Sequence, residues 1–305
     1  MSETQANLFS IDVGRKRVFV SQPYQATASN LVGRQPEMEL MSAAWMAPTD
    51  GLPLSPLLLG EPGVGKNRLV YEMAMRTGKD LYIFQGHEDV TAEDLACAVR
   101  FSDVSDTKMD YVVSPLVTAM LTGGICFIDE IAKIRPRALA LLVSVLDERR
   151  YIDSTLLGER VYAKPAFRFV AATNTADLEG NAMPEFLRSR LRPIISVGYP
   201  DRDEINDIVT RRHPWLADGK DSLFNIFWML WERGAQKRPP TPRDALYLFD
   251  LASSMADFET HGRRQSANEG GKLSLEIGAV RARLTAAHVE RAFHELFGKR
   301  DGNAV

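Results

Sequence analysis

A glycine-rich loop near residue 60 constrains this chain more than any other feature. Residues 60–67 read Gly-Glu-Pro-Gly-Val-Gly-Lys-Asn, the pattern of a phosphate-binding loop except at Asn67, where Ser or Thr is usual. The apolar run at 57–59 is typical of a buried parallel strand, and residues 68–75 contain no Gly or Pro and predict a helix. The alternative is a chance glycine turn, but these flanks favour a nucleoside triphosphate site.

Each part of this loop has a physical role at a triphosphate. Glycines let backbone N–H groups wrap around phosphate oxygens, and the N-terminus of the following helix adds partial positive charge. We expect Lys66 to reach the β- and γ-phosphates. Asn67 offers a carbonyl oxygen instead of a hydroxyl, so it either ligates Mg²⁺ or contacts only phosphate or bridging water. The predicted nucleotide-binding residues are Gly60, Glu61, Pro62, Gly63, Val64, Gly65, Lys66 and Asn67.

Composition narrows the class of protein. With 305 residues, 45% hydrophobic and 25% charged, the chain is typical of soluble globular proteins. Its net charge of −3 argues against nucleic acid as a partner. Cys97 and Cys126 form no closely spaced metal or redox motif, and the first residues do not resemble a signal peptide. The most apolar later stretch, 223–231, is too short to span a bilayer, so we expect a cytoplasmic protein without a membrane span.

Strand-like and helical patterns alternate along the middle of the chain, which predicts an α/β fold with a mostly parallel sheet covered by helices. The expected strands are 57–59, 81–84, 125–128, 167–172 and 194–197. Thr91 and Asp94 resemble a capping box that opens a helix over 92–99. A further apolar helical face is expected from Leu139, Leu142, Val143 and Leu146.

The two ends of the chain differ from this pattern. Residues 8–22 predict a β-hairpin, and strand signals stop after residue 200. Thr241-Pro242 and Thr285 are typical helix starts, each followed by an apolar stripe, whereas 260–275 resembles an exposed loop. We therefore expect three parts: a hairpin extension at 1–25, an α/β nucleotide-binding domain at 26–200 and a helical domain at 201–305.

A second chemical signal follows the expected strand at 125–128. There Asp129 and Glu130 place two carboxylates at the carboxyl edge of the sheet, where ligands of α/β proteins bind. Asp129 is expected to hold Mg²⁺, usually through water, and Glu130 to polarise the attacking water. These roles suffice for phosphoryl transfer, which depends on positioning and charge neutralisation. An apolar run before Asp-Glu is by itself as often structural, but its place about 60 residues after the glycine loop favours catalysis.

Three weaker signals follow in order. Asn174 ends an apolar strand and is expected to orient the lytic water or sense the γ-phosphate; the alternative is a simple turn former. Arg188 and Arg190 lie in an expected helix and either reach a neighbouring subunit's nucleotide or form a solvated basic face. Arg243 begins the helix after Thr241-Pro242 and either reaches phosphate or is an ordinary surface arginine.

Taken in order, these segments resemble the AAA+ ATPases, and most closely the MoxR-like, dynein-related branch. Residues 60–67 are similar to the family's Walker A motif and 125–130 to Walker B, which implies that Glu130 is the catalytic glutamate. The segment containing Val32 and Gly33 resembles the stretch beside the adenine. The resemblance implies a P-loop (AAA+) fold whose parallel sheet core precedes a smaller, all-helical C-terminal lid.

The same resemblance assigns the remaining positions. It implies that Asn174 is sensor 1, Arg190 the arginine finger with Arg188 in reserve, and Arg243 sensor 2 of the lid. Residues 145–152 resemble the helix that leads into the pre-sensor hairpin.

Residues 100–113 correspond to a loop that this branch inserts into its second helix and points at the ring pore. Within that segment Met109 and Tyr111 either grip a partner or pack locally. The hairpin at 8–22 has no counterpart in the family that we can assign.

The function implied is ATP binding and hydrolysis, with Mg²⁺, by a homo-oligomeric ring that we expect to be a hexamer. Such ATPases remodel a protein substrate in a chaperone-like way, often with a von Willebrand A-type partner. Asn67 departs from the family pattern and motivates an alternative, a nucleotide-gated assembly module with weak or no hydrolysis. A DNA-acting motor is a third reading, but the chain has no basic stripe that supports it.

Overall fold

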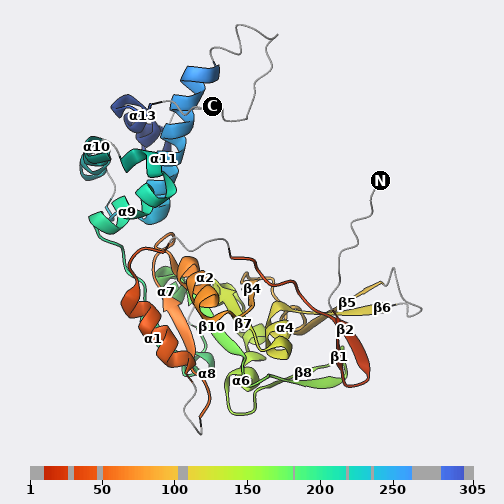
Figure 1. Cartoon of the computed structure of the whole chain (residues 1–305). Coiled ribbons are helices and arrows are strands. Elements are labelled where there is room, and N and C mark those ends of the chain that lie inside the picture. Colours follow the sequence, from red (N-terminus) through yellow and green to blue (C-terminus); the bar gives the residue numbers. More distant parts are fainter. Residues whose placement is uncertain are drawn as a thin grey trace, which may run out of the picture. The chain divides into compact units, whose positions relative to one another are not determined.

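The chain divides into two units, Met1–Gly198 and Tyr199–Val305. A computed structural model describes residues 10–26, 31–46, 51–101, 109–180, 183–217, 220–234, 237–262 and 283–298. Figure 1 shows both units, the first built around a sheet and the second from helices.

A five-stranded parallel sheet forms the centre of the first unit. Its strands are β3 (Ser55–Leu59), β4 (Leu81–Gln85), β7 (Ile125–Asp129), β10 (Arg168–Thr173) and β11 (Leu191–Ser196). Their order is β11-β3-β10-β7-β4, and every neighbouring pair is parallel. Leu57, Leu58 and Phe127 are fully buried, because helices cover both faces. The five predicted strands and the α/β class are thereby confirmed.

Short helices surround this sheet. They are α1 (Gln35–Trp45), α2 (Lys66–Thr77), α3 (Ala92–Ala96), α4 (Pro115–Thr122), α5 (Pro136–Leu139), α6 (Leu142–Leu146), α7 (Thr175–Gly180), α8 (Glu185–Arg188) and the 3₁₀ turn η1 (Ile131–Lys133). The strand order brings the carboxyl ends of β3, β7 and β10 together at one edge.

Two helix predictions need correction. The helix expected over 92–99 begins at its Thr91 cap but ends at Ala96, since Cys97–Phe101 pair antiparallel with Met109–Val113 and become a strand. The single apolar face expected over 139–146 is divided between α5 and α6. In the first case, pairing with a segment further along the chain outweighs local helical periodicity.

A second, four-stranded sheet joins the N-terminal hairpin to the segment after α3. Its strands are β1 (Ser10–Val13), β2 (Lys16–Phe19), β5 (Cys97–Phe101) and β6 (Met109–Val113), in the order β1-β2-β6-β5 (Figure 1). The predicted hairpin is confirmed, and its second strand pairs in parallel with β6, Val18 opposite Tyr111. Met109 is 55% exposed, whereas the ring of Tyr111 lies 4.5 Å from Nζ of Lys16.

A third, two-stranded sheet follows α6 and consists of β8 (Tyr151–Ser154) and β9 (Glu159–Tyr162). It stands where the resemblance implies the pre-sensor hairpin. Nζ of Lys16 also lies 3.4 Å from the backbone oxygen of Leu156, in the turn between β8 and β9. The N-terminal hairpin therefore contacts both β6 and this turn.

The elements that the structure describes in the second unit are all helical. Its elements are α9 (Arg202–Arg212), η2 (Pro214–Ala217), α10 (Lys220–Arg233), α11 (Pro242–Asp257), η3 (Phe258–Gly262) and α13 (Ala286–Phe297). Phe227, Phe249 and Val289 are fully buried in its core. The helix starts expected at Thr241 and Thr285 are confirmed. Most of the loop expected over 260–275 lies outside the described residues.

Candidate nucleotide site

The glycine loop joins β3 to α2, as the sequence predicts. Gly60 passes very close to the backbone just after β11. A Cβ atom at Gly60 would lie 2.3 Å from the backbone oxygen of Val197. Helix α2 begins at Lys66 with Gly65 as its N-cap, and no side chain caps it. Because the first N–H groups of a helix lack intrahelical acceptors, they face the loop as donors for an anion.

Lys66 lies inside this loop with only 7% of its surface exposed. Its ammonium group donates to the backbone oxygens of Gly60 and Glu61 at 2.6 and 3.1 Å, and to Oδ1 of Asn174 at 2.9 Å. Three acceptors match the three protons of an ammonium group. The lysine thereby links the glycine loop to the end of β10, where a bound phosphate would compete for the same protons.

Asn67 contacts the end of β7. Its Nδ2 donates a 2.8 Å hydrogen bond to Oδ2 of Asp129, while Oδ1 of Asp129 accepts from the backbone N–H of Glu130 at 2.9 Å. Tyr71 lies one turn further along α2, and burial is the main cause that raises its pKa. Asn67 thus stands against the carboxylate predicted to hold Mg²⁺, with its amide nitrogen rather than its oxygen facing that carboxylate.

Glu130 adopts an unusual conformation at the same edge. Its φ of 54° is left-handed, which costs a non-glycine residue about 1–3 kcal/mol and is frequent at functional sites. Oε2 accepts from Nε2 of Gln85 at 3.0 Å and from Nζ of Lys133 at 2.8 Å. Gly86 packs against this turn, since a Cβ there would lie 2.6 Å from the backbone oxygen of Glu130.

Asn174 bridges two charged groups. Its Oδ1 accepts from Lys66, and its Nδ2 donates to Oδ2 of Asp177 at 3.0 Å. These two contacts define the orientation of the Asn174 amide, whose oxygen faces Lys66 and whose nitrogen faces Asp177. The structure thus brings Lys66, Asn67, Asp129 and Asn174 together through two side-chain hydrogen bonds.

Sequence reasoning missed three polar neighbours: Gln85, Lys133 and Asp177. Each had a positional signal. Gln85 ends β4 beside Asp129 in the parallel register, Lys133 follows Glu130 by three residues, and Asp177 follows Asn174 by three. Spacings of three within a turn bring side chains to one side.

The segment predicted to lie beside the adenine is connected to the loop through its neighbour Arg34. Val32 is half-buried and Gly33 is exposed. Nη2 of Arg34 donates to the backbone oxygens of Val64 and Gly198 at 3.2 and 2.7 Å. These bonds hold the segment against the glycine loop, while adenine contact by Val32 and Gly33 stays a prediction.

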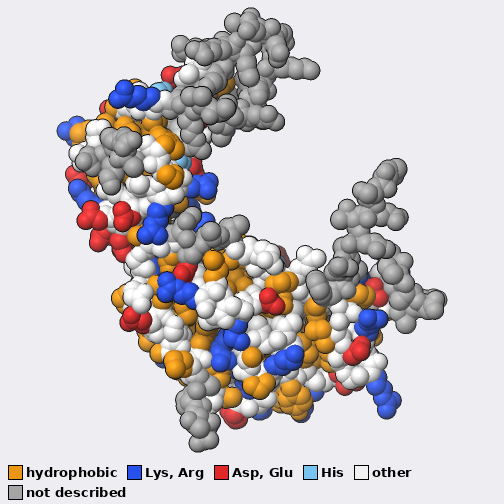
Figure 2. Space-filling view, in the orientation of Figure 1, with side chains coloured by type: hydrophobic (Ala, Val, Ile, Leu, Met, Phe, Trp, Pro, Cys, Tyr) orange, Lys and Arg blue, Asp and Glu red, His pale blue; other side chains and the backbone are white. Residues whose placement is uncertain are grey.

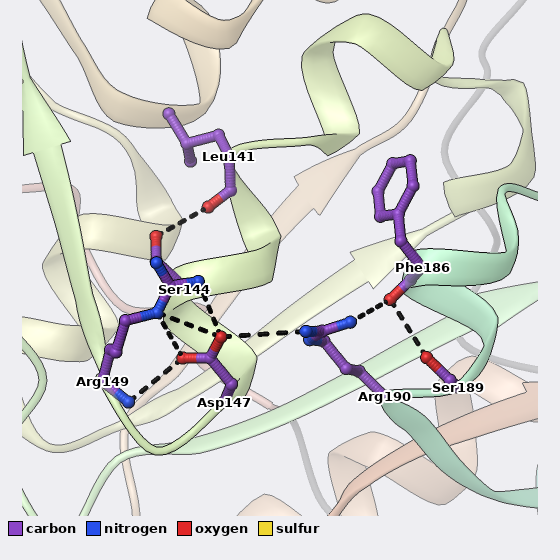
Figure 3. A network of polar contacts seen from close by, with 7 residues as sticks. All are labelled: Leu141, Ser144, Asp147, Arg149, Phe186, Ser189 and Arg190. Carbon is purple, nitrogen blue, oxygen red and sulfur yellow. Dashed lines mark hydrogen bonds and ion pairs between the residues drawn. The ribbon is translucent and has the colours of Figure 1, made fainter.

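Arg190 contacts two residues of its own chain, Phe186 and Asp147, as Figure 3 shows. Nη1 donates to the backbone oxygen of Phe186 at 2.6 Å, and Nη2 lies 3.9 Å from Oδ2 of Asp147. Asp147 is held more closely by Arg149, whose Nη2 donates at 2.7 Å and whose hydrogen bonds lower the pKa of that carboxyl. Arg188 is exposed. Both arginines stay candidates for the finger.

Arg243 lies in the first turn of α11 in the second unit, where it is exposed. The helix is well anchored, because Thr241 and Asp244 form a reciprocal capping box at its start. The role of Arg243 as sensor 2 stays a prediction.

The donors present fit Mg²⁺. Among the residues that the structure describes, no cluster of three or more His, Cys, Asp or Glu side chains converges on a metal-sized site. Mg²⁺ does not need one, since it is usually bound by one or two carboxylates, waters and substrate phosphates. The carboxylate of Asp129 and the amide oxygen of Asn67 are oxygen donors of that kind beside the phosphate loop.

The sheet order, the glycine loop after β3 and the acidic pair that begins at the end of β7 define a P-loop nucleotide-binding fold. Residues 55–191 match the family model of the AAA domain, dynein-related subfamily. Over this segment, which is just under half of the chain, the protein is similar to AAA+ domains of this branch, and the match confirms the resemblance predicted from the motifs.

Relatives by sequence cover part of the chain. An uncharacterised protein of Staphylococcus saprophyticus is 30% identical over 158 residues, which are 51% of this chain and 60% of that protein. Protein NorQ of Paracoccus denitrificans is 35% identical over 118 residues, covering 39% and 43%. The denitrification regulatory protein NirQ of Stutzerimonas stutzeri is 33% identical over 138 residues, covering 45% and 47%. The matched part thus spans about three-fifths or less of these relatives.

Solved structures support the fold. One mutant form of RuvB from Thermotoga maritima superposes with a TM-score of 0.55 at 20% identity, covering 89% of this chain and 73% of that one. A second mutant form of RuvB gives a TM-score of 0.53 at 20% identity, covering 87% and 70%. At such identities the likeness shows the AAA+ fold alone. In the part of the chain that the structure describes, no helix is long and apolar enough to cross a membrane.

Proposed function

We propose that this chain binds ATP with Mg²⁺ at the carboxyl edge of its central sheet and hydrolyses the γ-phosphate bond. The observation that carries this proposal is the pair of hydrogen bonds that converge on one loop, Lys66 to Asn174 and Asn67 to Asp129. The match of residues 55–191 to the AAA domain model also supports it.

The roles follow from position. Loop N–H groups and Lys66 bind the phosphates, and Asp129 with Asn67 holds the cation, whose chemistry is to neutralise charge on the phosphate oxygens. Glu130 polarises the attacking water as general base. Asn174, which already hydrogen-bonds Lys66, exchanges that partner when a γ-phosphate arrives. Val32 and Gly33 contact the adenine.

We further propose that the chain acts in the cytoplasm as a homo-oligomeric ring, a hexamer, that remodels a protein substrate with a von Willebrand A-type partner. In such a ring Arg190 reaches the neighbour's nucleotide, and Arg243 reports nucleotide state to the lid. The similarity to the AAA+ family supports this picture. So does the pair of strands β5–β6, whose Phe101 is 82% exposed and Met109 55% exposed.

The primary test compares wild type with Glu130→Gln. We expect both to bind a fluorescent ATP analogue with Mg²⁺, and the variant to lose about 10²- to 10³-fold in steady-state hydrolysis. Lys66→Ala should lose nucleotide binding itself. Equal turnover by wild type and Glu130→Gln, with nucleotide bound to both, would contradict the proposed hydrolysis.

A nucleotide-gated assembly module is the second candidate. Two contacts favour it: the amide of Asn67 occupies Oδ2 of Asp129, and the ammonium group of Lys133 neutralises Glu130. In that case ATP binding drives oligomer formation, measured by light scattering, without Mg²⁺-dependent phosphate release.

A DNA motor is a weaker candidate. RuvB is a Holliday junction branch migration motor, but only its fold is similar to that of this chain. On the face drawn in Figure 2, Lys and Arg side chains stand as separate spots among acidic and apolar ones rather than as a continuous stripe. Salt-sensitive DNA binding would revive this candidate.

A further inference from the structure

Lys133 stands at the nucleotide site without a role in the proposed reaction. It ends the 3₁₀ turn η1, which follows Glu130 directly. Its Nζ lies 2.8 Å from Oε2 of Glu130, and the two side chains are 39% and 32% exposed. The contact is therefore accessible from solvent and not locked by burial.

More than one carboxylate acts on this ammonium group. The hydrogen bond from Lys133 to Glu130 raises the pKa of Lys133, and the charges of Asp177 and Asp129 act in the same direction. The three carboxylates come from β7, the turn after it and α7, and Glu130 is the one in direct contact with Lys133. Lys66, another lysine at this edge, donates to two backbone oxygens and Asn174.

We propose that Lys133 is a tethered counter-cation of the site, which competes electrostatically with the divalent cation that accompanies the nucleotide. This inference rests on the proposed function, because it requires a nucleotide–Mg²⁺ complex at Asp129. Lys133 thereby sets how strongly nucleotide binding depends on the metal.

The physical reason is charge balance. Before nucleotide and metal bind, the ammonium group offsets part of the negative charge of Glu130, Asp129 and Asp177. A divalent cation at Asp129 then meets a site that is already partly neutralised, and it is repelled by the ammonium group across a partly solvated distance. A metal-free triphosphate, in contrast, gains from the same positive charge.

Two affinities therefore respond in opposite directions when the charge is removed. In Lys133→Met we expect metal-free nucleotide to bind more weakly and the Mg²⁺-loaded nucleotide to bind as well as or better than in wild type. The ratio of the affinity in Mg²⁺ to that in EDTA rises by about tenfold, the scale of one unit charge at a partly solvated site. A purely structural contribution of Lys133 would change both affinities by the same factor and leave the ratio unchanged.

The experiment measures equilibrium binding of a fluorescent, non-hydrolysable ATP analogue to the full chain, in Mg²⁺ and in EDTA, at fixed ionic strength. Lys133→Arg keeps the charge and should keep the wild-type ratio. Lys164→Met makes the same charge change just before β10, at the opposite end of the strands. This control variant should also keep the wild-type ratio.

An unchanged ratio in Lys133→Met, while wild type binds the analogue, would overturn the inference and leave the proposed function intact. Absence of binding by wild type in both buffers would overturn both. A raised ratio in Lys164→Met equal to that in Lys133→Met would attribute the effect to net charge and also reject the specific role of Lys133.

Discussion

The side-chain amide of Asn67 donates a 2.8 Å hydrogen bond to Oδ2 of Asp129. The residue that replaces the usual hydroxyl of the phosphate loop thus holds the neighbouring carboxylate through its nitrogen. A cation that enters here finds one carboxylate oxygen already engaged by Asn67 and the other by the N–H of Glu130. We therefore predict that Asn67 positions Asp129 at a cost in metal affinity.

Asn67→Thr should strengthen the Mg²⁺ dependence of ATP hydrolysis, because threonine frees Oδ2 of Asp129 and offers a hydroxyl oxygen. We expect the Mg²⁺ concentration for half-maximal turnover to fall by about tenfold, the lower end of effects seen when groups around a metal site change. Asn67→Asp also removes the amide donor and adds a carboxylate oxygen beside Asp129, so it should strengthen Mg²⁺ binding as well. A Mg²⁺ titration of steady-state hydrolysis tests both variants. An unchanged half-maximal Mg²⁺ concentration in Asn67→Thr would show that the Asn67 amide does not affect metal binding.

Gly86→Ala should destabilise the first unit and slow hydrolysis. The new Cβ would lie 2.6 Å from the backbone oxygen of Glu130, so the turn that carries the proposed general base must shift. We expect a loss of about 1–3 kcal/mol in the free energy of unfolding. Gly198→Ala is the matched control, because nothing lies within 4 Å of a Cβ at that position. Thermal unfolding of the two variants should differ; equal midpoints would refute the steric argument.

Asp147 should make stability depend on acid pH. Hydrogen bonds from Arg149 lower the pKa of Asp147, so its contribution to stability is present above the unfolded-state pKa of about 4 and is lost as pH falls through the folded-state value. Asp147→Asn should lower the unfolding midpoint by about 2–4 °C at pH 7. The gap between variant and wild type should narrow below pH of about 4. A gap that stays constant from neutral pH into that acid range would exclude this linkage.

Arg190 can be tested across a subunit interface. Mixing Arg190→Ala subunits with Glu130→Gln subunits should restore part of the hydrolysis that each lacks alone, because some interfaces then combine an intact glutamate with an intact arginine. Replacing Arg190→Ala by Arg188→Ala in the mixture identifies which arginine acts. If neither mixture recovers while both assemble normally, no arginine of α8 or the turn after it serves the neighbour.

Thr241→Ala should weaken the second unit. Oγ1 of Thr241 accepts from the N–H of Asp244 at 3.2 Å, and the backbone N–H of Thr241 donates to Oδ2 of Asp244 at 2.8 Å. Loss of such a cap costs about 0.5–2 kcal/mol. Ser254→Ala, on an exposed face of the same helix, should change stability by less than about 0.5 kcal/mol. Urea unfolding followed by tryptophan fluorescence separates the two.

The sequence predicted the central sheet well because buried parallel strands are continuous apolar runs between turn signals. It also predicted that Asp129 and Asn174 follow such runs, so their convergence at one edge followed from the fold class alone. What it could not supply was the partner of each polar group. That Asn67 would present its nitrogen to Asp129, and that Arg190 would fold back onto Phe186, depends on side-chain rotamers set by three-dimensional packing.

The helix expected over 92–99 went wrong for a similar reason. The residues of Cys97–Phe101 carry no local strand signal. They form a strand because they pair with Met109–Val113, which in turn pairs with β2 from the start of the chain. Local periodicity therefore predicts secondary structure most reliably where a segment packs against residues that are close to it in the sequence.

The parallel pairing of β2 with β6 carries a practical warning for shortened versions of this protein. Deleting the residues before position 20 would strip two of the four strands from the sheet β1-β2-β6-β5 and leave a two-stranded ribbon. Such ribbons are marginally stable alone, and an uncovered strand edge invites pairing between molecules. Aggregation of a truncated protein would then reflect a missing neighbour of β6 and say nothing about the nucleotide site.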